Sequence, residues 1–235
     1  MKVTCQRDSL LTACQLVSAA VAQRTTKPAL SNIKAVAQDD ALTLVAYDME
    51  VGIRYELRGI TVTRAGSCLL PIIELMKILK ESSDPDISLD AGTEAIVAKT
   101  SGGRFDMPSL DVNEFPDIPT FNDGGRYHEI SAGALRTMIR RTAFAADKKD
   151  TTARFALTGV LWEAEAKEAR LVATDTKRLA VCPGPASVYG VADDVKAVHL
   201  VPLKAVGLLE RNLTDDNELV RVGLRANDAL FQTER

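Results

Sequence analysis

Leu44-Val45-Ala46-Tyr47-Asp48 reappears in this chain as Leu171-Val172-Ala173-Thr174-Asp175, 127 residues further on. Each copy is an apolar run that ends in an aspartate, which is typical of a buried strand that stops at a turn. Upstream, Ile33 corresponds to Val160 at the same offset. A segment that recurs in this way predicts an internal repeat, and an internal repeat decides the fold class before any other feature does.

Two more matches, one upstream and one downstream of this segment, keep the same order in both copies. Leu10 to Val17 corresponds to Leu135 to Thr142 at an offset of 125, and Leu70-Pro71 corresponds to Val201-Pro202 at an offset of 131. Insertions in loops account for this drift. We therefore expect two copies of one module. Prolines and glycines in the segment 111–125 interrupt regular structure, so we expect module one at residues 1–125 and module two, unfinished at its C-terminal end, at 126–235.

Within each module, helical and strand patterns alternate. Apolar stripes at helical spacing predict helices over 9–22, capped by Asp8 or Ser9, and over 131–146, capped by Ser131. A proline at the first helical position predicts two more, over 71–81 and 202–212. Strict alternation predicts a half-solvated antiparallel strand over 51–58, and other strands fit residues 32–37, 41–47, 94–100, 159–165, 168–173 and 228–233. The expected fold class is α+β, with two helices packed on antiparallel sheet in each module.

Composition narrows the range of functions. The 235 residues are 46% hydrophobic and 26% charged, as in ordinary soluble proteins, and no apolar run reaches the ~20 residues of a membrane-spanning helix. Arg7 and Asp8 interrupt any secretory signal, so we expect a cytoplasmic protein that is not associated with a membrane. The four cysteines form no C-x-x-C pair, and His128 lies far from His199. We therefore expect reduced, buried cysteines and neither a metal nor a cofactor.

Positive charge gathers on the polar faces of the predicted helices and in the loops that follow them. Basic side chains without interleaved aromatic residues fit contacts to phosphate, which give affinity without sequence preference. Solvated helix faces are the alternative explanation. The net charge of −3 does not decide, because a protein that encircles DNA needs positive charge only on its inner wall. The candidate DNA contacts are Arg24, Lys77, Lys80, Arg136, Arg140, Lys148, Lys149 and Lys204.

No catalytic arrangement emerges from the sequence. The glycines after Ser101 precede a strand and not a helix, so they do not form a phosphate-binding loop. The repeat-related Asp48 and Asp175 are the carboxylates that stand out. They are expected to bond local backbone N–H groups at strand ends. A two-module hydrolase that uses one of them with a metal is a rival hypothesis, and an adaptor without a DNA role is another.

With these elements placed, the chain resembles the beta subunit of bacterial DNA polymerase III, the DNA sliding clamp, along its entire length. The resemblance rests on Met1-Lys-Val-Thr4, Thr43–Glu50, Glu114-Phe-Pro-Asp117, Leu157-Thr-Gly-Val-Leu161 and, most specifically, Val172-Ala-Thr-Asp-Thr-Lys-Arg-Leu-Ala-Val181. Thr176-Lys177 departs from the family, which commonly has Gly-His there. The family has three modules per chain, so the resemblance also implies that this chain is a fragment that lacks the third.

The resemblance implies a non-catalytic processivity factor, closed head to tail as a homodimeric ring of six modules around duplex DNA. Implied partners are the polymerase III alpha subunit, the clamp loader, repair polymerases, mismatch repair proteins and ligase. A pocket for partner peptides is expected at Leu157, Thr174, Lys177, Arg178 and Leu179. The first module's side of the dimer interface is expected at Ile78, Arg104, Phe105 and Met107, with Phe105 and Met107 on one face of an edge strand.

Overall fold

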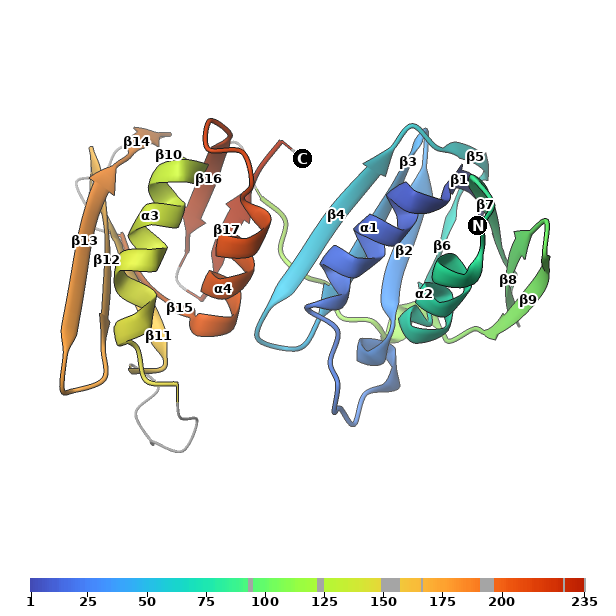
Figure 1. Ribbon diagram of the computed structural model, residues 1–235, viewed down its shortest axis with the longest axis horizontal. Helices are drawn as coiled ribbons and strands as arrows, with labels where there is room; N and C mark the ends of the chain where they lie inside the picture. Colours follow the sequence, from blue (N-terminus) through green and yellow to red (C-terminus); the bar gives the residue numbers. More distant parts are fainter. Residues whose placement is uncertain are drawn as a thin grey trace. The chain divides into compact units, whose positions relative to one another are not determined.

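The computed structural model describes residues 1–92, 95–121, 125–148, 157–165, 167–190, 197–225 and 227–234. The chain divides into two compact units, Met1–Ile118 and Pro119–Glu234 (Figure 1). The division falls inside the segment 111–125 that carries the boundary signals. The boundary expected after Gly125 lies within the second unit, because Phe121 already packs its ring edge-on against Tyr127 there.

The first unit has two antiparallel sheets and two helices. One sheet has the order β5 (Thr61–Arg64), β1 (Lys2–Gln6), β7 (Asp86–Ala91), β8 (Ala95–Thr100), β9 (Gly103–Pro108), and the other has the order β4 (Gly52–Arg58), β3 (Ala41–Tyr47), β2 (Ile33–Gln38), β6 (Gly66–Leu70). The helices are α1 (Arg7–Ser18) and α2 (Ile72–Glu81). Two 3-10 turns, η1 (Pro28–Ser31) and η2 (Val112–Glu114), lie outside the sheets.

The second unit repeats this design. Its sheets have the orders β14 (Ser187–Tyr189), β10 (Tyr127–Ser131), β16 (Leu219–Leu224), β17 (Ala229–Gln232) and β13 (Leu179–Pro185), β12 (Glu168–Thr174), β11 (Gly159–Ala164), β15 (Ala197–Pro202). The helices are α3 (Ala132–Thr142), followed by the 3-10 turn η3 (Ala143–Ala145), and α4 (Leu203–Asn212). The expected α+β class with antiparallel sheets is confirmed.

The strand registers show that equivalent residues of the two units have equivalent pairing partners. In the first unit Lys34 pairs with Val45 on one side and Leu69 on the other. In the second, Leu161 pairs with Val172 and Leu200. The offsets are 161 − 34 = 127, 172 − 45 = 127 and 200 − 69 = 131, the same as those in the sequence matches.

Each unit has one main core between its helices and the inner faces of both sheets. The stripe expected for the second unit's first helix is confirmed, since Leu135, Met138, Ile139 and Thr142 are all buried. Ser131 caps that helix, with Oγ accepting from the Ala134 N–H at 3.3 Å. The four cysteines are free and buried as expected, and burial raises the pKa of the first three (Cys5, Cys14 and Cys68) to about 12.

Helix α1 differs from its expected range of 9–22. It begins at Arg7, whose N–H donates to the Pro85 carbonyl at 2.8 Å, and neither Asp8 nor Ser9 caps it. It ends at Ser18 because the following amides, such as that of Ala20, bond carbonyls three residues back and tighten the chain into turns. Every helix in the described part of the chain is too short or too polar to cross a lipid bilayer.

A buried histidine is expected to make the stability of the second unit depend on pH. His128 on β10 is 1% exposed, and burial, followed by the positive charge of Arg126, lowers its pKa from 6.5. The unfolded chain therefore binds a proton near pH 6.5, whereas the folded unit does not bind it at that pH. Folding stability should be intact above that pH and fall below it, by up to about 1.4 kcal/mol per pH unit.

We expect His128→Phe to flatten this acid dependence between pH 7.5 and 5.5. Urea unfolding followed by fluorescence of Trp162, the single tryptophan, reports on the second unit. The chain's other histidine supplies the control, His199→Gln, which should keep the wild-type slope. An unchanged slope in His128→Phe would assign the acid sensitivity to other groups.

Candidate functional site

The two helices of each unit lie side by side on one face of its sheets (Figure 1), and they contact each other, α1 with α2 and α3 with α4. This arrangement places most of the candidate DNA contacts on the helical side. Lys77 and Lys80 are exposed on α2, and Lys204 is exposed on α4. Arg24 and Lys148 are exposed in the segments that follow the first helix of each unit, whereas Lys149 lies outside the described residues. The helical side is mixed in charge, because Glu74 and Glu81 are also exposed there.

Two of the expected cations, Arg136 and Arg140, form ion pairs within the second unit. Arg136 donates from Nη1 to the Leu213 carbonyl at 2.9 Å and from Nη2 to the Asp216 carboxylate. It therefore joins α3 to the segment after α4, so it is less available to phosphate than the exposed cations are. Arg140 pairs with Glu210 at 2.8 Å, but its side chain stays 61% exposed. The sequence could not reveal either pairing, since the partners lie 70 to 80 residues away.

Asp48 and Asp175 act on their own turns. Oδ1 of Asp48 accepts from the amides of Glu50 and Val51 at 3.1 and 2.8 Å. Oδ1 of Asp175 accepts from the amides of Lys177 and Arg178 at 3.1 and 3.0 Å. Partial desolvation raises the pKa of Asp175, but these amide bonds and the charge of Arg178 outweigh it and bring the pKa below its ordinary value.

The expected structural role of both aspartates is therefore confirmed. Nowhere among the described residues do three His, Cys, Asp or Glu side chains gather closely enough to hold a metal ion.

The same turns hold a residue in the left-handed region, Met49 with φ 80° and Thr176 with φ 75°. A left-handed conformation costs an L-residue roughly 1–2 kcal/mol and is worst for a β-branched side chain. This is the position at which Thr176 departs from the family's common glycine.

We expect Thr176→Gly to stabilise the second unit by about 0.5–1 kcal/mol, after the entropy that glycine adds to the unfolded chain is subtracted. Thermal unfolding measures the change. Met49→Gly in the equivalent turn is the matched control and should gain less, because methionine is not β-branched. A loss of stability in Thr176→Gly would show that the turn is not strained.

Four of the expected pocket residues, Thr174, Lys177, Arg178 and Leu179, belong to the turn between β12 and β13 and to the adjoining strand ends. Thr174 Oγ1 accepts from the Thr176 amide and donates to the Arg178 carbonyl at 2.7 Å. Leu179 is 67% exposed, which rules out the core burial that its chemistry alone would favour, and Leu157 is half-buried.

An aromatic residue, Phe144, also lies at this site, although no sequence pattern predicted it there. The Arg178 guanidinium lies 5.6 Å from the ring centroid of Phe144, which is 52% exposed. Phe144 lies in the 3-10 turn after α3, and a lone aromatic residue beyond a helix end carries no pattern that would assign it to a site.

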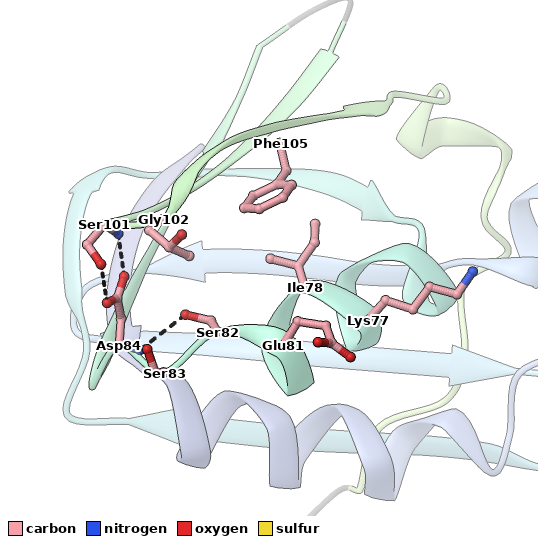
Figure 2. A pocket seen from close by; sticks show the side chains of 10 residues that line it. Lys77, Ile78, Glu81, Ser82, Ser83, Asp84, Ser101, Gly102 and Phe105 are labelled. Atoms are coloured by element: carbon pink, nitrogen blue, oxygen red, sulfur yellow. Dashed lines mark hydrogen bonds between the residues drawn. The ribbon is translucent and has the colours of Figure 1, made fainter.

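Two of the four expected interface residues of the first unit, Ile78 and Phe105, line a hollow of about 400 Å³. Figure 2 shows Phe105 from β9 and Ile78 from α2 pointing toward each other across it. β9 is the last strand of its sheet, as expected of an edge strand, and Phe105 is 40% exposed. Arg104 pairs with Asp106 at 2.9 Å beside it.

Met107 does not belong to this surface. It shares a strand face with Phe105, but it pairs with Ile96 and is 3% exposed within the main core. Alternation along a strand predicts the face on which a side chain lies, but not how far the covering helix extends. The sequence therefore could not show that Phe105 is partly exposed and that Met107 is buried. Met107 is therefore enclosed in the single chain, and its expected place at the dimer interface stays a prediction.

Comparisons with known proteins agree with this architecture. The family described as DNA polymerase III beta subunit, N-terminal domain, matches residues 1–119, and its central domain matches residues 129–235. The beta sliding clamp of Bacillus subtilis is 29% identical over 100% of this chain and 62% of its own length. That of Pseudomonas putida is 32% identical over 95% of this chain and 60% of its own length.

Solved structures match in three dimensions. The DNA polymerase sliding clamp from B. subtilis superposes with a TM-score of 0.90 at 28% identity, over 99% of this chain and 62% of that one. The sliding clamp from Pseudomonas aeruginosa bound to griselimycin gives 0.87 at 29% identity, again over 99% and 62%.

Two units of one α+β design, matched at these scores, place the protein in the class of DNA-clamp folds. The chain belongs to the DNA polymerase III beta subunit family. It spans about 60–62% of the length of the curated relatives it matches.

Proposed function

We propose that this chain forms the first two modules of a DNA sliding clamp, a non-catalytic ring that tethers a replicative polymerase to duplex DNA. The observation that carries the proposal is the pairing of helices on one side of each unit, in a fold that superposes on DNA polymerase sliding clamps at a TM-score of 0.90. In such a ring the helices face the DNA and the sheets form the rim. The ring holds DNA by enclosing it, so sequence-independent contacts suffice.

The DNA-facing cations of this proposal are Arg24, Lys77, Lys80, Arg140, Lys148, Lys149 and Lys204. Arg140 contributes less than a free arginine, because Glu210 neutralises part of its charge. Exposed acidic residues on the same helices keep the contacts weak, which suits a protein that must slide.

The hollow of Ile78 and Phe105 is our proposed first-module side of the head-to-tail interface. An edge strand offers unpaired N–H and C=O groups to a partner strand, and a half-exposed aromatic beside it is a suitable anchor.

The Leu179 pocket is our proposed docking site for polymerase III alpha subunit, clamp loader, repair polymerases, mismatch repair proteins and ligase. Leu157 and Leu179 supply its apolar surface, and Thr174, Lys177 and Arg178 border it. Griselimycin, which occupies the P. aeruginosa clamp, is a suitable probe of this pocket.

Residual binding to linear duplex DNA tests the ring's proposed inner wall. We expect binding by the intact chain to weaken steeply with salt and to be indifferent to sequence. Replacing Arg24 and Lys148 by alanine should weaken all duplexes alike. It should also reduce the slope of log K against log salt by about 0.9 for each phosphate that the variant no longer neutralises.

Arg54→Ala with Arg58→Ala removes the same charge from β4, on the side of the sheet that faces away from the helices, and should leave binding unchanged. Fluorescence anisotropy at several salt concentrations measures both pairs. Equal losses from the two pairs, or a preference for one sequence, would contradict the proposed orientation. No DNA binding by any form at low salt would favour the adaptor hypothesis.

A further inference from the structure

The two units differ in the charge of their paired helices. In the first unit, α1 and α2 carry three basic residues, Arg7, Lys77 and Lys80, and three acidic residues, Asp8, Glu74 and Glu81. In the second unit, α3 and α4 carry one acidic residue, Glu210, and five basic residues, Arg136, Arg140, Arg141, Lys204 and Arg211. The helices of the first unit therefore have no net charge, whereas those of the second unit are strongly positive.

The repeat locates this difference at single positions. Helix α3 begins 125 residues after α1, and the bounds of α4 are those of α2 shifted by 131 residues. At these offsets Arg140 corresponds to Gln15, Arg141 corresponds to Leu16 and Lys204 corresponds to Ile73. Gln15 is exposed and Ile73 is 64% exposed. The first unit therefore has neutral side chains at positions where solvent would accommodate a cation.

The three cations without a charged counterpart lie at one end of the helix pair. Arg136, in the first half of α3, donates to the carbonyl of Leu213, which directly follows α4. The two helices lie side by side (Figure 1) and therefore run antiparallel. The last turn of α3, with Arg140 and Arg141, is consequently at the same end as the first turn of α4, with Lys204. We call Arg140, Arg141 and Lys204 the basic end of the second unit.

The acidic segment after α4 lies at the opposite end. The carbonyl of Asp216 accepts from the Gly133 amide at 3.1 Å, at the start of α3. At about 1.5 Å per residue, Gly133 is about 12 Å along the helix from Arg141, which exceeds the Debye length of about 8 Å at physiological salt. At the basic end itself, Glu210 neutralises part of the charge of Arg140. Arg141 is exposed and forms no ion pair within the described part of the chain.

We propose that duplex DNA is held chiefly at the basic end of the second unit, and that the helices of the first unit contribute little to affinity. This division rests on the proposed function and adds Arg141 to the phosphate contacts. Affinity for the DNA backbone grows with the number of phosphates that cations neutralise, whatever the base sequence. Lys77 and Lys80 also face the DNA in the proposed ring, but Glu74 and Glu81 on the same helix offset their charge.

Removal of charge from the basic end tests the proposal in the intact chain. Arg141→Gln with Lys204→Gln changes two exposed positions, so the fold should be retained, and thermal unfolding checks this. Binding to linear duplex DNA should weaken at least about tenfold at about 50 mM salt, and the slope of log K against log salt should fall by about 0.9 for each of the two phosphates. Arg54→Gln with Arg58→Gln removes the same charge from β4 and should leave both quantities unchanged.

Transfer of charge to the first unit is the converse test. Gln15→Arg with Ile73→Lys places cations at the positions that correspond to Arg140 and Lys204, and both positions are exposed. This variant should bind linear duplex DNA several-fold more tightly than the wild type, with a steeper dependence on salt. Because it adds side chains at the surface and removes no contact in the second unit, its result does not depend on the stability of the first variant.

The outcomes separate this proposal from the proposed function. Equal effects of Arg141→Gln with Lys204→Gln and of Arg54→Gln with Arg58→Gln would overturn the basic end as the main contact, while salt-dependent binding by the wild type would still support a DNA clamp. No gain from Gln15→Arg with Ile73→Lys would also overturn it, because charge at these positions would then not determine affinity. Absence of wild-type binding at low salt would overturn the basic end and the DNA role together.

Discussion

If griselimycin binds the proposed pocket of this chain, replacing Leu179 by aspartate is expected to weaken that binding by at least about 30-fold, because the ligand would bury a carboxylate without a partner. Leu179 is 67% exposed in the free chain, so the folded state has little to lose. A change in stability within about 0.5 kcal/mol is expected for such a surface position. Calorimetric titration measures the binding, and thermal unfolding checks the fold.

Leu219→Asp is the matched control for this prediction. Leu219 is 51% exposed on β16, in the other sheet of the same unit, and it undergoes the same chemical change. Binding in this variant should equal that of the wild type. If both variants lose binding equally, the loss reflects charge or stability, and the pocket is placed wrongly.

Replacing Phe115 by alanine is expected to destabilise the first unit by about 3–5 kcal/mol, the usual range for emptying a buried phenylalanine site. Phe115 is 4% exposed over Val45 and Leu69. Its removal opens a cavity, exposes both aliphatic side chains and removes the ring beside Lys34. The expected loss is a large fraction of the free energy of unfolding of a typical domain, which is about 5–15 kcal/mol.

The two units offer separate readouts of this variant. Trp162 belongs to the second unit, so urea unfolding followed by its fluorescence should be unchanged. The circular dichroism transition of the whole chain should acquire an early phase from the first unit. Phe144→Ala, at a 52% exposed position, should cost less than about 1 kcal/mol. Equal losses in the two variants would show that the segment 111–118 does not stabilise the first unit.

The sequence determined the repeat, the fold class and the turn chemistry. Leu135, Met138, Ile139 and Thr142 are buried as their spacing predicts, because helical periodicity is a local property that one stripe of residues displays completely. Asp48 and Asp175 bond the amides two and three residues on, which short polar side chains do wherever a strand ends. Such features depend on neighbours along the chain, so they can be read without the fold.

Only the tertiary structure decided which matching residues are accessible. Phe105 and Met107 share a strand face, yet only Phe105 reaches the hollow while Met107 is enclosed in the core. Arg136 and Lys80 look equally available on their helices, yet Arg136 is held by residues far along the chain. Val45 and Val172 occupy the same register position, yet Val45 is buried and Val172 is only half-buried. Burial and pairing depend on side chains brought together from distant parts of the sequence, and periodicity along a single element carries no record of them.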